Sequence, residues 1–355
     1  MKLIRILILT MIMASLGATS CLAELYSPVS ITKLGAATEQ YDWPQGLVAA
    51  NGGAYVMDGT IIKFVKDKKV QQVYSLNSLQ PELTKKGLNG FNLVRSFRLA
   101  QMEYAGGQIY VSGLLFDNRE DEKVKKGDRI LLGDSYILIF TVKGNKASIL
   151  QLTKVKTHWS SGPFAVFETK SGAPEDTYAW GDYKLYDYAK YILYPRFMFY
   201  KGALVFLREK EGDNRGALKQ VVKLKGGKEE IVFEWYGDYI NDQVVSWHFT
   251  QPVLEEYQLK IYTGDDALQT VNLLSGEIET TRWHEMFKMQ RPRYRNGQML
   301  FLNNERFFIE QGVIETYEAK DFAFSGNISG YDFDGKNLYI LNYDSRSLSI
   351  FKIKP

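Results

Sequence analysis

The C-terminal stretch 330–353, GYDFDGKNLYILNYDSRSLSIFKI, reads as three short strands joined by two tight turns. In the first strand aromatic residues alternate with aspartates, which is the period-two pattern of a half-buried strand. Asp334-Gly335 supplies a turn that needs positive φ, and a second polar turn at 343–347 separates two apolar strands. Weaker copies of this unit recur along the chain, so the sequence predicts an all-β fold built from repeats.

Five clear copies of the unit begin with a glycine followed by an apolar strand, and they define the repeat length. Two intervals between these glycines are 95 residues long, about twice a single repeat, so each hides a degenerate copy. The hidden copies lie around Gly162 and over 253–262. Six steps from residue 53 to residue 335 then average 47 residues, the length of a four-stranded propeller blade. The five glycines are Gly53, Gly107, Gly202, Gly297 and Gly335.

The repeat predicts a single β-propeller over 24–355, with seven blades and six as the next alternative. The last unit supplies only three strands, so a closed ring needs a fourth strand from elsewhere. The segment 26–34 precedes the first complete unit and reads as a strand. We expect this segment to pair with the last blade and close the ring; the alternative is a strand packed elsewhere.

The segment 333–353, FDGKNLYILNYDSRSLSIFKI, resembles a blade of the YVTN/NHL-type bacterial β-propellers. In that family an Asp-Gly-Lys turn, an apolar strand and a polar hairpin recur. The resemblance implies a fold and carries over no catalytic residues, because such repeats share an architecture across many functions.

The first 23 residues have the pattern of a secretory signal. A basic start precedes an apolar core at 6–16, which is too short to span a bilayer. Cleavage after Ala23 would give a soluble protein, and cleavage before Cys21 would give a lipid-anchored one. We therefore expect an exported protein in the periplasm or cell envelope of a bacterium, with a membrane contact only through a lipid on Cys21.

Composition excludes several function classes. Cys21 is the only cysteine, so the chain has neither an intramolecular disulfide nor a cysteine nucleophile beyond that position. The net charge is +3, and a balance this near neutral argues against a dedicated nucleic-acid surface.

Compact catalytic motifs are absent from the sequence, which contains no HExxH, no GxSxG and no glycine-rich phosphate loop after a strand. Three histidines each lie next to a tryptophan in different repeats, so their imidazoles could converge on a metal ion. We favour the alternative, amphipathic His-Trp pairs at blade edges, and expect no cofactor. The histidines are His158, His248 and His284.

An aromatic run between 178 and 194 is the strongest candidate for a ligand or partner surface. Rings with polar tips suit stacking on sugars or contact with peptides at low entropic cost. The alternative is that tyrosine fills strand faces here as it does elsewhere. The candidate residues are Tyr178, Trp180, Tyr183, Tyr186, Tyr188, Tyr191 and Tyr194.

Two smaller charged groups have weaker functional interpretations. Arg293 and Arg295 could line a channel mouth that binds an anionic ligand, or they could belong to a solvated face. Asp332 and Asp334 offer the oxygen ligands that Ca²⁺ prefers but lack the spacing of a calcium loop, so a solvated turn is expected.

These features together predict a monomeric, non-catalytic propeller that binds a protein, peptide or glycan partner or acts as a scaffold. The alternative is a propeller-type enzyme, lactonase-like or glycan-cleaving, with a metal-dependent site at the channel mouth. Whether the protein is an enzyme is left open, with the non-catalytic interpretation preferred.

Overall fold

The computed structural model describes residues 27–36, 44–88, 93, 97–116, 131–158, 166–169, 189–200, 203–213, 216–225, 228–237, 253–255, 257–263, 267–282, 290–295, 298–302, 306–310, 317–321 and 326–353. The predicted signal segment lies outside these residues. Within them, none of the helices has the length and apolar character needed to span a bilayer. Strands dominate these ranges, which confirms the prediction of a mostly β protein.

Successive strands pair antiparallel with their chain neighbours, as expected for repeated hairpins. The first sheet contains β2 (Pro44–Ala50), β3 (Gly53–Asp58), β4 (Ile61–Lys66) and β5 (Lys69–Ser75). A short 3₁₀ helix, η1 (Leu76–Leu79), and α2 (Gln80–Lys85) follow it. Two later sheets have the same order: β15 (Val253–Glu255), β16 (Gln258–Thr263), β17 (Ala267–Asn272) and β18 (Ile278–Arg282), and then β19 (Gln290–Arg295), β20 (Gln298–Leu302), β21 (Arg306–Glu310) and β22 (Tyr317–Asp321).

The middle of the chain forms one nine-stranded sheet in which the strands are also in sequence order. Its fifth strand, β10, is four residues long and pairs with both β9 and β11, so it joins two groups of four strands. In the described chain, β10 is the strand that represents the repeat predicted around Gly162. The strands are β6 (Phe97–Ala105), β7 (Gln108–Phe116), β8 (Leu131–Lys143), β9 (Lys146–His158), β10 (Val166–Thr169), β11 (Ala189–Tyr200), β12 (Ala203–Asp213), β13 (Gly216–Lys225) and β14 (Lys228–Gly237).

The last sheet joins the two ends of the described chain. Its order is β1 (Ser30–Lys33), β25 (Ser347–Lys352), β24 (Asn337–Asn342) and β23 (Ile328–Phe333). β1 runs antiparallel to β25, with Ser30 opposite Ile350 and Lys33 opposite Ser347. The predicted segment 26–34 therefore does supply the fourth strand of the last unit.

A buried ion-pair cluster fixes the chain where it leaves β1. The carboxylate of Asp58, which is 2% exposed, accepts from Lys63 Nζ at 2.6 Å and from Arg346 Nη2 at 2.8 Å. The same two cations hold the chain after β1, since Lys63 also donates to the Leu34 carbonyl and Arg346 to the Gly35 carbonyl. One carboxylate thus ties the first sheet, the last sheet and the exit of β1 together.

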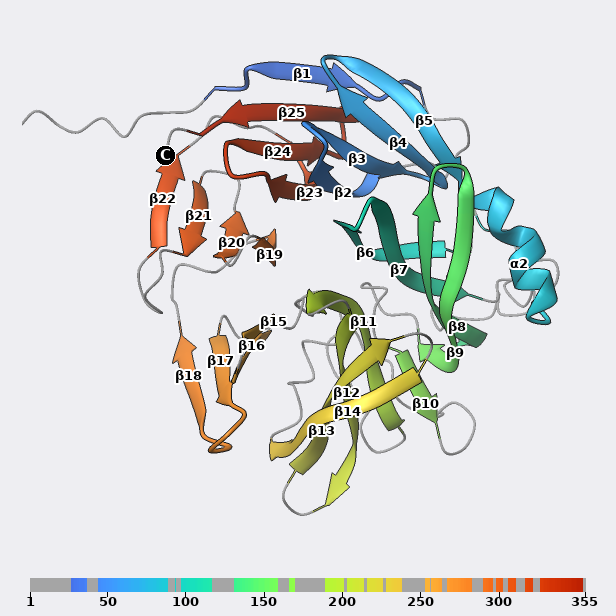
Figure 1. Cartoon of the computed structure of the whole chain (residues 1–355), viewed down its shortest axis with the longest axis vertical. Coiled ribbons are helices and arrows are strands. Elements are labelled where there is room, and N and C mark those ends of the chain that lie inside the picture. Colours follow the sequence, from blue (N-terminus) through green and yellow to red (C-terminus); the bar gives the residue numbers. More distant parts are fainter. Residues whose placement is uncertain are drawn as a thin grey trace, which may run out of the picture.

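The sheets are arranged around a common centre (Figure 1), and apolar cores lie between the first and last sheets and between the last sheet and the β19–β22 sheet. The two faces of β24 show how the period-two pattern produces this packing. Tyr339 and Leu341 join a core with the first sheet, whereas Leu338 and Ile340 join a core with the β19–β22 sheet. A third cluster, with the edge-to-face ring pair Phe97–Phe140, lies between the first and the nine-stranded sheets.

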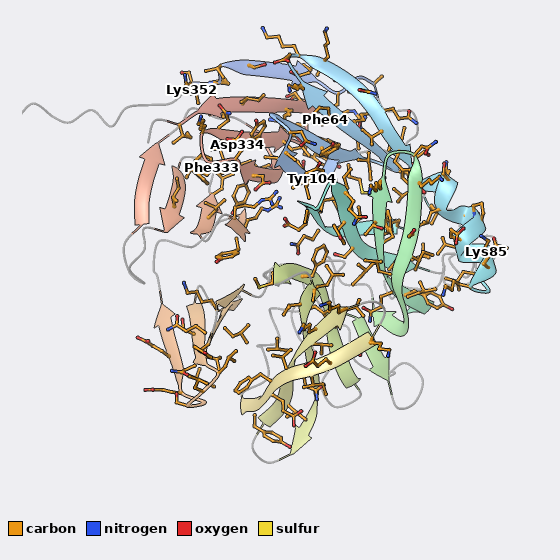
Figure 2. All side chains as sticks on the ribbon, viewed as in Figure 1. Phe64, Lys85, Tyr104, Phe333, Asp334 and Lys352 are labelled. Atoms are coloured by element: carbon orange, nitrogen blue, oxygen red, sulfur yellow. The ribbon has the colours of Figure 1, made fainter. Side chains whose placement is uncertain are left out.

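The predicted Asp-Gly turn forms between β23 and β24, and Gly335 has the positive φ that such a turn needs, +96°. Figure 2 shows Asp334 at this turn. Its Oδ1 accepts the backbone N–H groups of Lys336 and Asn337, and its Oδ2 accepts the Tyr339 hydroxyl. Partial burial opposes ionisation of Asp334, but these hydrogen bonds outweigh it and keep its pKa below the ordinary value.

Candidate functional site

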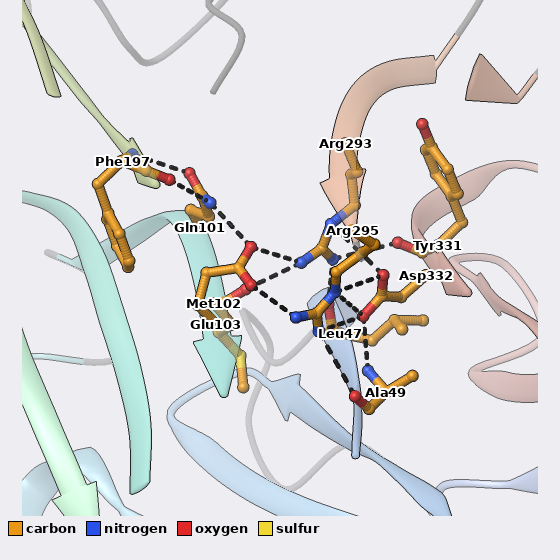
Figure 3. A network of polar contacts seen from close by, with 10 residues as sticks. All are labelled: Leu47, Ala49, Gln101, Met102, Glu103, Phe197, Arg293, Arg295, Tyr331 and Asp332. Atoms are coloured by element: carbon orange, nitrogen blue, oxygen red, sulfur yellow. Dashed lines mark hydrogen bonds and ion pairs between the residues drawn. The ribbon is translucent and has the colours of Figure 1, made fainter. Parts of the chain in front are cut away.

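The centre of the molecule is formed by the first strand of each four-stranded group (Figure 1). β2 lies beside β23 on one side and β6 on the other, β11 lies beside β6, and β19 lies beside β23. In the described sheets β2, β6, β19 and β23 each have one edge without a strand partner, and β10 pairs with only the first part of β11, so buried backbone groups at these edges need other partners. Side chains from these same strands provide them, in the network drawn in Figure 3.

Arg293, on β19, binds the free edges of three other strands. Its Nη1 donates to the carbonyls of Leu47 on β2, at 2.6 Å, and of Tyr331 on β23, at 3.2 Å. Its Nη2 donates to the Met102 carbonyl on β6 at 3.1 Å and to Glu103 Oε1 at 2.8 Å. The planar guanidinium thus replaces a missing strand partner for several carbonyls at once.

Arg295 lies on the same side of β19, two residues further along, and pairs mainly with Asp332 of β23. Its Nε lies 3.0 Å from Asp332 Oδ1 and its Nη2 lies 2.6 Å from Oδ2, which makes a two-pronged ion pair. Arg295 Nη1 also lies 3.0 Å from Glu103 Oε2. Asp332 Oδ2 accepts the Ala49 N–H of β2 at 2.7 Å, so β2, β6, β19 and β23 are all connected.

Gln101 extends the network to β11. Its Nε2 donates to the Phe197 carbonyl at 2.7 Å and its Oε1 accepts the Phe197 N–H at 3.0 Å, so the amide pairs with the backbone as a neighbouring strand would. The same Nε2 lies 2.9 Å from Glu103 Oε1. Five first strands, β2, β6, β11, β19 and β23, are therefore linked by one continuous set of hydrogen bonds.

The network is buried and its formal charges balance, with two arginines against two carboxylates. Asp332 is 0% exposed and Glu103 is 4% exposed. Burial opposes the ionisation of Asp332, but Arg293 and Arg295 outweigh it and hold the pKa of Asp332 below its ordinary value. Burial likewise opposes the charge on Arg295, yet Asp332 and Glu103 raise the pKa of Arg295 above its ordinary value. Asp332 and Arg295 therefore form a charged, buried pair.

The structure gives Arg293 and Arg295 internal partners, and their predicted contact with an anionic ligand stays a prediction. The expectation of a solvated turn at Asp332 is wrong, because Asp332 is buried against these arginines. Tyr191 and Tyr194 lie on β11 and His158 ends β9, but their side chains fall outside the described part. The other candidates lie wholly outside the described residues: Tyr178, Trp180, Tyr183, Tyr186, Tyr188, His248 and His284.

Sequence reasoning missed Gln101 and Glu103 as partners of the arginines. The only available signal was polar residues at alternate positions in an otherwise apolar strand, and that pattern is equally typical of a solvent-facing side. Among the residues that the structure describes, no group of three or more His, Cys, Asp or Glu side chains is arranged to hold a metal ion. The central network as it stands stabilises the assembly of strands, since its charges are directed at one another.

Comparison with models of protein families gives no match. Comparison of the sequence with curated proteins gives no match either. Solved structures similar in shape include the WD40 β-propeller domain of Doa1, with 11% identity, 92% of this chain and 97% of that chain covered, and a TM-score of 0.43. A chain of a mitotic checkpoint complex is 10% identical, with 95% of this chain and 96% of that chain covered and a TM-score of 0.47. The computationally designed Ika8 protein is 9% identical, with 91% of this chain and 100% of that chain covered and a TM-score of 0.40.

These similarities are distant, so the class of the protein follows from its own strands. Four-stranded antiparallel sheets arranged around a centre, as in this structure, are typical of β-propellers. The particular resemblance of 333–353 to YVTN/NHL-type repeats stays a prediction.

Proposed function

We propose that the protein is an exported β-propeller of the bacterial envelope that acts as a non-catalytic binding or scaffold module. The observation that carries this proposal is the central network. In a propeller enzyme, polar groups at the centre would be available to a substrate or a metal ion. Here the charged side chains of β6, β19 and β23 pair with one another and with backbone groups, and the neutral Gln101 joins β11 to them, which supports a rigid frame.

We infer six blades, which is the alternative to the seven blades that the repeat spacing predicts. The supporting observation is that β10 divides the nine-stranded sheet into β6–β9 and β11–β14, each with four strands in sequence order. Together with the other four sheets of the described residues these make six groups of four strands, each with its first strand toward the centre. The pairing of β1 with β25 and the ion pairs of Asp58 support closure of the ring between the first and last blades.

The proposed partner is a protein, peptide or glycan that contacts the aromatic run between 178 and 194. The run follows β10 and leads into β11, whose Phe197 is held by Gln101 at the centre. A ligand surface attached to that strand would be positioned by the rigid frame, which is the arrangement that precise recognition requires. Export is proposed from the signal pattern in residues 1–23.

The test combines a binding measurement with a matched control. The purified chain would be assayed against a glycan array and against an envelope protein fraction by crosslinking. Replacement of Tyr183, Tyr186 and Tyr188 by Ala is expected to abolish the binding found while leaving the melting temperature unchanged. Tyr257→Ala, at a tyrosine that is 57% exposed outside the run, serves as the control and should bind normally.

Two results would contradict the proposal. Turnover of a lactone or glycan by the purified protein would support the enzyme alternative. A melting temperature that falls in step with binding in the triple variant would show that the tyrosines fill strand faces. Export is checked separately by the mass of the mature chain, which distinguishes cleavage after Ala23 from a lipid-bearing Cys21.

A further inference from the structure

A cluster of polar and aromatic side chains lies where the hairpin turn after β2 meets the end of β6. Asn51 and Gly52 form that turn, with φ of +55° and +71°, as expected for the two-residue turn that Asn-Gly favours. Asn51 Nδ2 donates to the hydroxyl of Tyr104 on β6 at 2.9 Å and to the hydroxyl of Tyr55 on β3 at 3.2 Å. The rings of Tyr55 and Tyr104 are stacked with centroids 5.5 Å apart, and Phe64 packs against Tyr55 at 4.7 Å (Figure 2). The turn thus brings together tyrosine hydroxyls from two sheets.

The polar groups of this cluster have unused hydrogen-bonding capacity. Both hydrogens of the Asn51 amide are used, so each tyrosine hydroxyl accepts one bond and keeps its own O–H to donate. Within the part of the chain that the structure describes, neither hydroxyl has an acceptor and the amide oxygen of Asn51 has no donor. Asn51 is exposed, and Tyr55 and Tyr104 are partly exposed, so a ligand can reach these groups.

A lysine from the adjacent hairpin adds positive charge to the cluster. Lys66 ends β4, and its Nζ donates to the backbone carbonyl of Asn51 at 3.2 Å. Lys66 is exposed and pairs with no carboxylate among the described residues, so its ammonium keeps two hydrogens for a ligand. The next two residues, Asp67 and Lys68, carry opposite charges, so the hairpin remains positive. We call these four residues the β2 turn site: Asn51, Tyr55, Tyr104 and Lys66.

The central network holds both strands that carry the site. On β2, the Ala49 N–H donates to Asp332 two residues before the turn. On β6, Glu103 pairs with both arginines of β19, one residue before Tyr104. A ligand would therefore meet groups whose positions are fixed in advance, which lowers the entropic cost of binding.

We propose that the β2 turn site binds an acidic saccharide, whose rings carry carboxylates as uronic acids do. The carboxylate suits the Lys66 ammonium and the two phenol donors, and a ring hydroxyl can donate to the Asn51 amide oxygen while it accepts from a tyrosine. Tyrosine side chains make such contacts at low entropic cost. An acidic side chain of a peptide would use the donors but leave the adjacent acceptor unused, which favours the saccharide. The site shares no residue with the aromatic run between 178 and 194, so it is a binding surface separate from the one in the proposed function.

The test measures binding of trigalacturonate by isothermal titration calorimetry, with maltotriose as the neutral trisaccharide. The parent chain is expected to bind trigalacturonate, and to bind it more weakly as the salt concentration rises, because salt screens the charge of Lys66. Lys66→Gln should lower the affinity for trigalacturonate about tenfold. Lys33→Gln is the matched control and should bind as the parent does, because Lys33 is exposed and its Nζ also donates to a backbone carbonyl at 3.2 Å.

Removal of single hydroxyls tests the tyrosines without disturbing the ring stack. Tyr104→Phe and Tyr55→Phe keep the rings, and each is expected to lower the affinity for trigalacturonate about threefold to tenfold. Tyr257→Phe, at a tyrosine that is exposed outside the site, should leave the affinity unchanged. Asn51→Gly keeps a residue that tolerates the positive φ of the turn but removes the amide, so it should abolish binding with a melting temperature within about 3 °C of the parent.

Several results would overturn the saccharide site. They are no binding of trigalacturonate by the parent, equal binding of maltotriose, or equal effects of Lys66→Gln and Lys33→Gln. Tighter binding of a polyglutamate peptide would assign the β2 turn site to an acidic peptide and overturn it as well. The triple variant at Tyr183, Tyr186 and Tyr188 should still bind trigalacturonate, so partner assays that fail while trigalacturonate binds contradict the proposed function alone.

Discussion

Replacing Asp332 by Asn tests whether the central network holds the first strands together. The change keeps the size and planarity of the side chain and one acceptor for the Ala49 N–H, but it removes the negative charge. Glu103 alone then faces both Arg293, at 2.8 Å, and Arg295, at 3.0 Å. One positive charge is left uncompensated at a site where Asp332 is 0% exposed.

The size of the effect follows from that burial. Removing one partner of a buried ion pair costs about 3–5 kcal/mol of unfolding free energy, because the remaining charge is desolvated without compensation. An exposed pair is worth less than about 1 kcal/mol. Glu82→Gln, which breaks the exposed pair of Glu82 with Lys85, is therefore the matched control. Adding Arg295→Met to Asp332→Asn removes the uncompensated charge and should restore at least about half of the loss.

The assay is urea unfolding followed by circular dichroism and by tryptophan fluorescence, for the parent, the two single variants and the double variant. Coincident transitions are needed before a free energy is compared between them. The interpretation is refuted if Asp332→Asn destabilises the chain no more than Glu82→Gln does. It is also refuted if Arg295→Met destabilises the Asp332→Asn chain further instead of restoring part of its stability, because the two side chains would then act independently.

Three further predictions test closure, the turn and the charge state. Leu34→Ala should lower the unfolding free energy by about 2–5 kcal/mol, because Leu34 is 3% exposed in the core between the first and last sheets. The control Val29→Ala, at an exposed side chain, should change the unfolding free energy by less than about 0.5 kcal/mol. Equal effects of the two variants in urea unfolding would contradict closure at this core. Gly335→Ala should lower the unfolding free energy by about 1–2 kcal/mol, measured by thermal unfolding, because the φ of Gly335 is +96° and alanine disfavours that conformation. No atom lies within 4 Å of the added methyl group, so the backbone conformation alone causes the loss. An unchanged melting temperature would show that the backbone relaxes. The pKa of Asp332 lies below the ordinary carboxyl pKa of about 3.9, so its contribution to stability is complete above that pH and is lost as the pH falls through its lower pKa in the folded state. The difference in unfolding free energy between the parent and Asp332→Asn should therefore be full at pH 7 and shrink below about pH 4. A difference that does not depend on pH would argue against an ionised Asp332.

The parts of the fold that local patterns determine could be predicted from the sequence. Alternating residues and the Asp-Gly turn placed β23 and β24, and the strand pattern of 26–34 together with the need for a fourth strand placed β1 against β25. Strand pattern and turn chemistry are properties of a few neighbouring residues, which is why they are readable. The number of blades was harder, because a short strand such as β10 can be counted as a degenerate repeat.

The central network could not be predicted because its partners are far apart in sequence. Arg293 and Glu103 are separated by 190 residues, and Gln101 and Phe197 by 96. Nothing in the local pattern of Arg293 shows whether its neighbours in space are carboxylates, backbone or solvent. From the sequence, Arg293 and Arg295 were candidates for binding an anionic ligand through their guanidinium groups. In the structure, the guanidinium group of Arg293 binds backbone carbonyls at the edges of neighbouring strands.

Closure of the ring by β1 can be tested most directly with an engineered disulfide. Ile31 lies opposite Ser349 in the register of β1 and β25, so Ile31→Cys with Ser349→Cys in a Cys21→Ser chain places two thiols across the pair. We predict an intramolecular disulfide in nearly all molecules, detected by mass and by electrophoretic mobility, with a melting temperature that falls on reduction. Free thiols under oxidising conditions, or disulfides only between molecules, would contradict the closed ring.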